Sequence, residues 1–366
     1  MAELIIGSLF LVLWTLAGGL QLLDSWWRSF ELSAIWTGTG FILSVFLIMT
    51  ILDLPMSIYR TFKLEQSFGF NKMTPKIFIM DMIKNGVIGL LIGTPLLILV
   101  LWIMENSGSY WWLYVWATWL SFSVFMMWAY PAFIAPLFNK FRPLEDGELK
   151  TRIENLLSRN GFKSQGIHVM DGSTRSAHGN AYFTGLGANK RIVFFDTLID
   201  ELSHDEIEAV LAHELGHFKC NHIKKRITVL GSVFLIGLGI LGWLINEMWF
   251  YSGLGVEQAS TYMALILFVI VSPAFTFFLQ PLFHKFFAFL NALYKCFMRY
   301  IPLLPCLFRV QTILARQIAM VCYLNLMYPC YLHFSPFKFF NIWAITSTVH
   351  PLPNILYRCV LLTISV

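Results

Sequence analysis

Two histidines and a glutamate occur together in the stretch His213-Glu214-Leu215-Gly216-His217, which has the pattern HExxH. Residues i and i+4 of a helix share one face, so His213 and His217 can bind one Zn²⁺ ion through their imidazoles. Glu214 stands beside the first histidine and can take the proton of a water molecule that the metal acidifies. These residue types at this spacing predict a zinc metalloendopeptidase with Glu214 as its catalytic base. An ordinary amphipathic helix with polar residues on one side is the alternative.

The helix that would carry the motif has its own start signal. Ser203 is a suitable N-cap, and Glu206 three residues later completes a capping box. Ala212 and Gly216 are small enough to let a neighbouring element approach the helix closely. This context favours the peptidase over the ordinary helix.

The motif lies in residues 139–226, the only polar segment long enough to fold as a small domain. Apolar residues at helical spacing predict a helix over residues 147–160. Short apolar runs predict strands at Ile167–Met170, Ala181–Thr184 and Arg191–Phe195, and a glycine-containing turn joins the last two. We therefore expect a small α+β metalloprotease domain whose last helix carries HExxH.

The rest of the chain is more apolar than a soluble protein of this size. Of its 366 residues, 57% are hydrophobic and 13% are charged. Buried helices of a large soluble domain would carry polar stripes, but the apolar runs here have few or none. The predicted fold class is mainly α, a polytopic α-helical membrane protein with the small α+β domain attached. The runs long enough to cross a bilayer are residues 4–23, 35–54, 86–104, 110–133, 227–250 and 262–282.

These runs divide the chain into four parts and orient it in the membrane. The parts are N-terminal transmembrane helices (1–138), the metalloprotease domain (139–226), two further transmembrane helices (227–282) and an atypical C-terminal region (283–366). Lys and Arg gather in residues 53–85 and 139–226, and two spans separate these segments, so both lie on one side. The positive-inside tendency makes that side cytoplasmic, although Arg28 lies in a loop on the opposite side.

Four phrases accompany the motif: residues 68–71 (Phe-Gly-Phe-Asn), 134–141 (Ile-Ala-Pro-Leu-Phe-Asn-Lys-Phe), 178–183 (His-Gly-Asn-Ala-Tyr-Phe) and 189–198 (Asn-Lys-Arg-Ile-Val-Phe-Phe-Asp-Thr-Leu). Together with HExxH they resemble the type 1 CAAX prenyl protease family, from the second apolar run to about Phe283. The resemblance implies a barrel of membrane helices around a large water-filled chamber, with the zinc site on its wall. It also implies cleavage of peptides near a prenylated C-terminal CAAX motif, or of membrane-associated substrates more generally.

The resemblance also assigns roles to individual residues. His213 and His217 would be ligands of one zinc ion per chain, and Glu214 would be the catalytic base. An exposed edge strand can pair with an extended peptide, and the resemblance implies that Asn180, Ala181, Tyr182 and Phe183 hold the substrate backbone. From its residue type alone, Asn180 could instead be a turn residue entering a strand.

Two other histidines are weaker candidates. His178 could line the substrate cleft or serve a structural turn, and His222 fits a helix end better than the zinc face. The expected partners are a peptide or protein substrate, prenylated or not, and the lipid bilayer. We expect no nucleic acid.

The third zinc ligand is missing from the place where the family has it. A catalytic zinc site needs three protein ligands, and the family takes the third from a glutamate in a phrase similar to E-F-x-A-D. Here residues 283–292 read Phe-His-Lys-Phe-Phe-Ala-Phe-Leu-Asn-Ala, and all 21 Asp and Glu lie at or before Glu257. We interpret this as a change of reading frame after about Phe283, with a diverged membrane-embedded tail as the alternative. His284 is a weaker candidate to replace the glutamate.

Three functions compete on these observations. The first is an active membrane metalloendopeptidase, and the second is a catalytically impaired, truncated or frameshifted copy of one. The second also fits an N-terminus that begins one span late relative to the family. The third is a transporter or channel, but transporters usually place ionisable residues within their spans, and the spans here have almost none.

Overall fold

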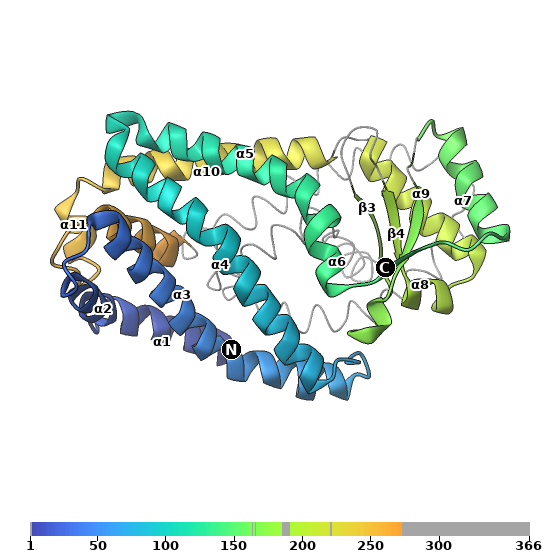
Figure 1. Ribbon diagram of the computed structural model, residues 1–366, viewed down its shortest axis with the longest axis horizontal. Helices are drawn as coiled ribbons and strands as arrows, with labels where there is room; N and C mark the ends of the chain where they lie inside the picture. The colour runs from blue at the N-terminus through green and yellow to red at the C-terminus, as the bar shows by residue number, and fades with distance from the viewer. Residues whose placement is uncertain (1, 163, 165, 185–190, 220–221, 273–366) are drawn as a thin grey trace, which may run out of the picture.

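The computed structural model describes residues 2–162, 164, 166–184, 191–219 and 222–272. Long helices occupy one end of the molecule, and a small sheet with its own helices occupies the other (Figure 1). Two hydrophobic cores correspond to this division. One lies among the long helices and includes Phe41 and Leu241, and the other lies around the sheet and includes Ile153 and Phe194.

Four helices are long and apolar enough to cross a membrane, namely Ala34–Glu65, Pro75–Asn106, Gly108–Phe138 and Ile223–Leu244. The first span consists of α3 (Ala34–Tyr59) and η1 (Arg60–Glu65), and the second is α4 (Pro75–Asn106). The third consists of η2 (Gly108–Tyr110), α5 (Trp111–Ala129), η3 (Tyr130–Ile134) and α6 (Ala135–Phe138). The fourth lies in α10 (His222–Leu244). Leu47, Leu91 and Ile236 on these helices are more than half exposed, as lipid-facing side chains are. The polytopic helical fold predicted from the sequence is therefore confirmed.

The first apolar run is not the single span that its composition predicts. Residues 4–23 are divided between α1 (Ala2–Trp14) and α2 (Gly19–Arg28). Gly18 lies between them with φ +79°, a conformation that disfavours L side chains. A Cβ at Gly19 would lie 2.7 Å from the carbonyl oxygen of Leu13. The prediction was wrong because hydropathy does not register a glycine pair that lets the chain turn.

The later spans also differ from their predicted limits. α4 begins at Pro75, where the Thr74 side chain accepts a hydrogen bond from the Ile77 N–H at 3.3 Å. The predicted run 227–250 ends as a helix at Leu244, and a separate short helix, α11 (Met248–Ser252), follows. A further apolar helix covers Thr261–Ser272. The remainder of run 262–282, the C-terminal region 283–366 and His284 lie outside the described residues.

The small sheet has four strands in the order β1-β2-β4-β3. β2 runs parallel to β4, whereas β1 and β3 pair antiparallel with their neighbours. The three predicted strands occur at their predicted positions. The elements of this part are β1 (Phe141–Pro143), α7 (Glu148–Arg159), β2 (Ile167–Met170), η4 (Gly172–Thr174), β3 (Ala181–Thr184), β4 (Arg191–Phe195), α8 (Asp196–Glu201) and α9 (His204–Lys219).

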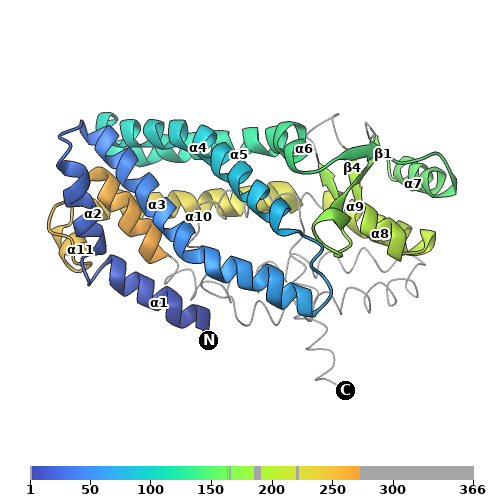
Figure 2. The ribbon, with the colours of Figure 1, turned by 60° about the horizontal axis from the view of Figure 1, so that its bottom comes forward.

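Four membrane-helix ends lie at the end of the molecule that carries the sheet (Figure 1). The end of η1, the start of α4, the end of α6 and the start of α10 all point toward it (Figures 1 and 2). The two basic segments predicted to share one side of the membrane do lie at the same end, because Lys72 N–H donates to the Arg175 carbonyl at 3.2 Å. Apolar packing holds α9 against the sheet, because Ile207 and Leu211 are fully buried in the core around it.

Candidate metalloprotease site

The helix α9 carries HExxH and begins directly after Ser203, as predicted. The Glu206 carboxylate accepts hydrogen bonds from the Ser203 N–H at 2.9 Å and from the Ser203 hydroxyl at 2.8 Å. The Ser203 carbonyl accepts the Ile207 N–H at 3.0 Å. The glutamate half of the predicted capping box is thus present, while the serine hydroxyl donates to that carboxylate. The position of the motif is fixed from the first turn of its helix.

Arg152 on α7 holds the same first turns from the side. Its Nε and Nη2 donate to Glu208 Oε2 at 3.1 and 2.9 Å, and Nη2 also pairs with Asp205. The Glu208 side chain is 20% exposed, so this part of the pair is shielded from solvent and is worth more than a surface ion pair. Sequence reasoning missed this contact because more than fifty residues separate Arg152 from its partners.

His213 and Glu214 lie half-buried in the second half of α9, and position 217 follows one helical turn after position 213. Burial raises the pKa of the Glu214 carboxyl from 4.5 to about 8. Among the residues that the structure describes, no group of three or more His, Cys, Asp or Glu side chains is placed so that it could hold a metal ion. Two histidine positions one turn apart beside the Glu214 carboxyl suit a divalent metal of the zinc type.

The strand β3 stands at the edge of the sheet and lies against α9. Asn180 lies opposite Phe195, and the Phe195 N–H donates to the Asn180 carbonyl at 2.9 Å. Because hydrogen-bonded and non-hydrogen-bonded pairs alternate in an antiparallel ladder, Tyr182 and Thr184 also direct their backbone groups toward β4. The N–H and C=O groups of Ala181 and Phe183 therefore point away from β4. No other described strand pairs with that edge.

One of these outward groups is already occupied. The Asn180 side-chain oxygen accepts the Ala181 N–H at 2.8 Å. This local hydrogen bond is the type by which asparagine caps a neighbouring backbone group. A peptide that pairs with this edge from its first residue must replace the Asn180 oxygen.

The side chains of β3 anchor the strand. Phe183 packs into the core around the sheet, with its ring 5.0 Å from that of Phe162. Tyr182 points to the opposite face, where its hydroxyl lies 3.9 Å from the Met170 sulfur, and burial raises its pKa. With both side chains partly buried, the backbone edge is the part of β3 best placed to meet a peptide.

His178, two residues before Asn180, takes the structural role. Its ring stacks on Phe70 at 4.3 Å between centroids, with the planes 16° apart. Its carbonyl accepts the Thr197 hydroxyl at 3.0 Å. Burial lowers the pKa of the imidazole, which favours the neutral ring in this stack. The backbone of His222, the other weaker candidate, lies at the start of α10 rather than at the end of the helix that carries HExxH, which ends at Lys219.

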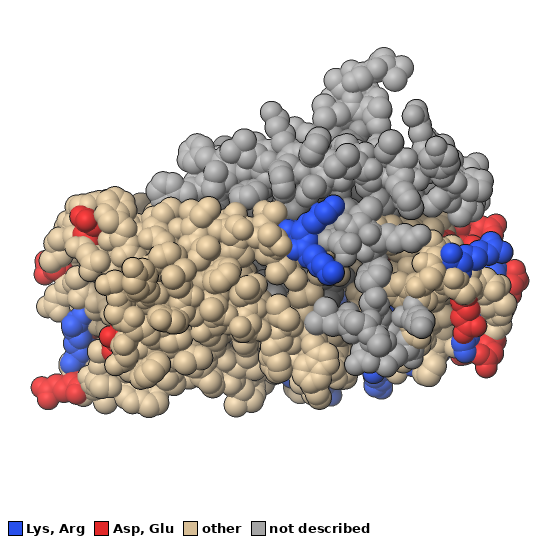
Figure 3. All heavy atoms as spheres, turned by 90° about the horizontal axis from the view of Figure 1, so that it is seen from above, with Lys and Arg blue, Asp and Glu red and all other residues tan. Residues whose placement is uncertain are grey.

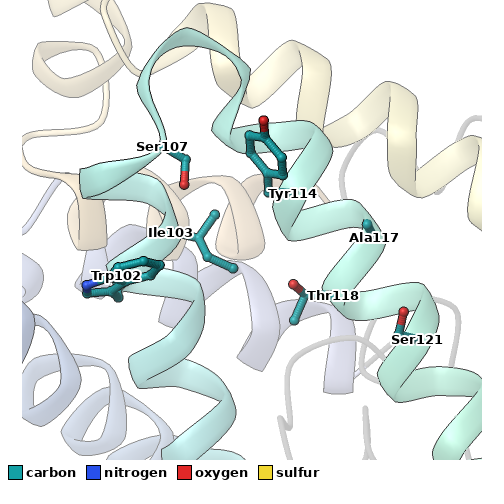
Figure 4. Close-up of a pocket in the computed structure, with 7 residues that line it drawn as sticks. All are labelled: Trp102, Ile103, Ser107, Tyr114, Ala117, Thr118 and Ser121. Atoms are coloured by element: carbon teal, nitrogen blue, oxygen red, sulfur yellow. The ribbon is translucent and has the colours of Figure 1, made fainter.

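A cavity of about 490 Å³ lies elsewhere, between α4 and α5 near their connection (Figure 4). It is at the end of the long helices remote from the sheet (Figure 1), so it is separate from α9 and β3. Its lining residues are Trp102, Ile103, Ser107, Tyr114, Ala117, Thr118 and Ser121.

Comparisons with known proteins agree with this arrangement. Residues 1–140 match the family model described as "CAAX prenyl protease N-terminal, five membrane helices", and residues 143–286 match peptidase family M48. The crystal structure of S. mikatae Ste24p is 35% identical, with a TM-score of 0.66 over 79% of this chain and 69% of that one. The chain belongs to the CAAX prenyl protease family of M48 peptidases.

Curated members of this prenyl protease family share the same region. The CAAX prenyl protease 1 homolog of Oryza sativa subsp. japonica is 41% identical over 230 residues, which are 63% of this chain and 54% of the relative. CAAX prenyl protease 1 of Saccharomyces cerevisiae is 51% identical over 175 residues, 48% of this chain and 39% of the relative. The chain thus spans about half the length of the curated relatives it matches. Because M48 is a metallopeptidase family, membership implies a metal cofactor.

Proposed function

We propose that this chain is a membrane zinc metalloendopeptidase that hydrolyses peptide bonds of CAAX-type or other membrane-associated substrates. The observation that carries the proposal is the contact between α9, with the half-buried Glu214 of HExxH, and β3, whose outer backbone edge can hold an extended peptide. The names of the curated relatives support the CAAX substrate class. A prenylated substrate fits a chain that presents this edge beside four membrane helices.

In the proposed site, His213 and His217 would hold the zinc ion. When bound, zinc polarises the scissile carbonyl and lowers the pKa of a coordinated water molecule. Glu214 is the residue of this chain that moves protons. Its carboxylate accepts the proton of the attacking water and later gives it to the nitrogen of the leaving amine. Burial raises the proton affinity of this carboxyl, which suits a group that must hold a proton between these two steps.

The substrate backbone pairs with β3. The Ala181 carbonyl and the Phe183 N–H and carbonyl point away from β4 and are available as ladder groups. The Ala181 N–H becomes available when the Asn180 side chain turns away, and the Asn180 amide can then hydrogen-bond the peptide. Asn180, Ala181, Tyr182 and Phe183 thus act as the substrate-binding residues, the last two through side chains that hold the strand in place.

We place the sheet on the cytoplasmic side of the membrane. Lys, Arg, Asp and Glu gather toward the ends of the molecule and around the sheet, while uncharged side chains cover the long helices between them (Figure 3). The sheet end carries the basic segments, and the positive-inside tendency supports a cytoplasmic location for them. The partners of the chain are then a peptide or protein substrate, prenylated or not, and the bilayer.

The test is metal content and peptide cleavage by the purified full chain. We expect one zinc ion per chain, loss of metal in a His213→Ala/His217→Ala variant, and loss of cleavage in Glu214→Gln with zinc retained. Glu154→Gln is a matched control, since Glu154 is an exposed glutamate on α7, and it should cleave as the wild type does. Cleavage that survives Glu214→Gln, or a chain that takes up no zinc, would refute the proposal.

A further inference from the structure

The side chain of Arg175 joins three segments of the chain near the sheet. Its Nε and Nη2 donate to the two carboxylate oxygens of Asp81 on α4, at 2.7 and 3.1 Å. Its Nη1 donates to the Asn139 side-chain oxygen at 3.0 Å, just after α6 ends. Arg175 itself lies six residues before Ala181, the first residue of β3. One guanidinium therefore connects the approach to the proposed substrate strand with the ends of two membrane helices.

Backbone pairing strengthens the same junction. The loop between η1 and α4 runs alongside the segment that leads to β3, with a bridge between Asn71 and Ser176. The Ala177 N–H donates to the Phe70 carbonyl at 2.9 Å. The stack of Phe70 on the His178 ring continues the contact toward Asn180. The loop of the membrane part is thus packed against the chain up to two residues before the substrate-binding residues.

The Arg175–Asp81 pair differs from the surface ion pairs of this protein. The two side chains are only 23% and 14% exposed, and two guanidinium nitrogens of Arg175 each donate to a different carboxylate oxygen of Asp81. By contrast, Arg142 and Glu145 are 67% and 87% exposed and lie 3.6 Å apart. Bidentate pairs shielded from water are stronger and more directional than exposed ones.

The junction at Arg175 can control how the sheet part is oriented relative to the membrane helices. The chain passes from the membrane helices to the sheet between α6 and β1 and returns between α9 and α10. Two connections alone allow the sheet part to tilt about the line that joins them. The contact of Arg175 with Asp81 of α4 lies beside the first connection, because the same guanidinium also donates to Asn139 between α6 and β1, and it attaches the sheet part to a further membrane helix. A tilt of the sheet part away from α4 would have to break this bidentate ion pair.

We propose that Arg175 and Asp81 form a clamp that fixes the height of the β3 edge over the bilayer and so selects which bond of a membrane-anchored substrate is cut. Arg175 is a positioning residue in this role, and the inference rests on the proposed peptidase function. A substrate held by a lipid or a membrane span reaches the site at a set distance from the membrane. A short soluble peptide has no such constraint and can follow the strand wherever it moves.

The clamp itself is tested by hydrogen exchange on the full chain in lipid nanodiscs. The amides of Lys72 and Ala177 donate across the junction. In Arg175→Ala they should exchange roughly tenfold faster, because the ion pair that holds the two segments together is lost. Arg175→Lys retains the charge without the fork and should give an intermediate rate. Arg142→Ala, which removes an exposed arginine of the same part, should leave both amides unchanged. Unchanged exchange in Arg175→Ala would overturn the clamp.

The consequence for cleavage is tested with one peptide sequence in two forms, soluble and anchored to vesicles by a C-terminal lipid. In Arg175→Ala we expect kcat/KM for the anchored form to fall about 10- to 100-fold or the cut to move to a neighbouring bond, since small misplacement of a substrate is costly. The soluble form should change by less than about twofold on the same reasoning.

Two results would overturn the height role. One is an equal loss for both substrates, which would make Arg175 a general structural residue. The other is an unchanged rate and cut site for the anchored form. If Glu214→Gln cleaves as the wild type does, the proposed peptidase function fails and the cleavage role with it, while the exchange rates still report whether the clamp exists.

Discussion

Replacing Glu214 by Gln should stabilise the metal-free protein, and the gain should grow with pH. Burial raises the pKa of this carboxyl to about 8, against 4.5 for an ordinary glutamate. Well below pH 4.5 the carboxyl is protonated in both the folded and the unfolded chain, so its burial costs the folded chain no proton-linked stability. As pH rises from 4.5 to 8, the unfolded chain releases the proton while the folded chain keeps it, so stability falls with pH.

The magnitude follows from the two pKa values. With 4.5 unfolded and about 8 folded, the destabilisation of the folded chain is about 1 kcal/mol at pH 5 and about 3 kcal/mol at pH 7. Glutamine carries no charge at either pH, so any fixed difference in packing cancels when the two pH values are compared. The stability advantage of Glu214→Gln over wild type should therefore increase by about 2 kcal/mol between pH 5 and pH 7.

The assay is thermal unfolding in detergent with a chelator present, at matched scan rates from pH 5 to pH 8. An increase of about 2 kcal/mol corresponds to a Tm advantage that grows by on the order of 5–10 °C for a domain of this size. Glu154→Gln, on the exposed face of α7, removes a carboxyl outside the site and is the matched control for the loss of one glutamate. Added zinc should abolish the pH dependence, because a nearby cation lowers the pKa of Glu214. A Tm difference that stays constant from pH 5 to pH 8 in the chelated protein would refute the reasoning.

Two further variants test the elements that hold the site. Arg152→Ala removes the hydrogen bonds to Glu208 and Asp205 and should destabilise the domain by about 1 kcal/mol, measured as a lower Tm, whereas the control Arg142→Ala should leave Tm unchanged. Asn180→Ala removes an amide that can bind the peptide and should raise KM by roughly tenfold with kcat nearly unchanged. A fall in kcat at constant KM would show that Asn180 acts on the reacting bond rather than on binding.

The elements that sequence predicted best are those with local signals. Ser203 and Glu206 mark the start of α9 three residues apart, and the strand Ile167–Met170 lies at its predicted limits. The start of α4 also has a local signal, Thr74 followed by Pro75, but the apolar pattern begins only at Gly86, so the predicted helix starts eleven residues too late. Gly18 and Gly19 are also apparent in the sequence. Hydropathy, however, does not distinguish one continuous apolar helix from two helices joined at a glycine pair.

The long-range contacts of the site had no such signal. The hydrogen bond of Arg152 to Glu208 spans 56 positions, and that of Arg175 to Asp81 spans 94. Charge type is visible in a sequence, but the partner of a given arginine depends on the packing of helices that meet only in the folded chain. The surroundings of Asn180 were also not visible in the sequence, since its residue type allowed a turn or a peptide contact. Only the pairing of Asn180 with Phe195 shows which backbone groups of β3 point away from β4.

The two arginines act on different halves of the proposed site. Arg152 holds the helix that carries Glu214, and Arg175 holds the chain that enters β3, so catalytic base and substrate edge are attached to separate supports. α7 belongs to the small domain, whereas α4 belongs to the membrane part. Chemistry at Glu214 therefore depends on packing within the domain, while the placement of a substrate depends on the membrane helices. In this arrangement the position of the substrate in the bilayer can affect its binding at β3 without moving α9, the helix that carries Glu214.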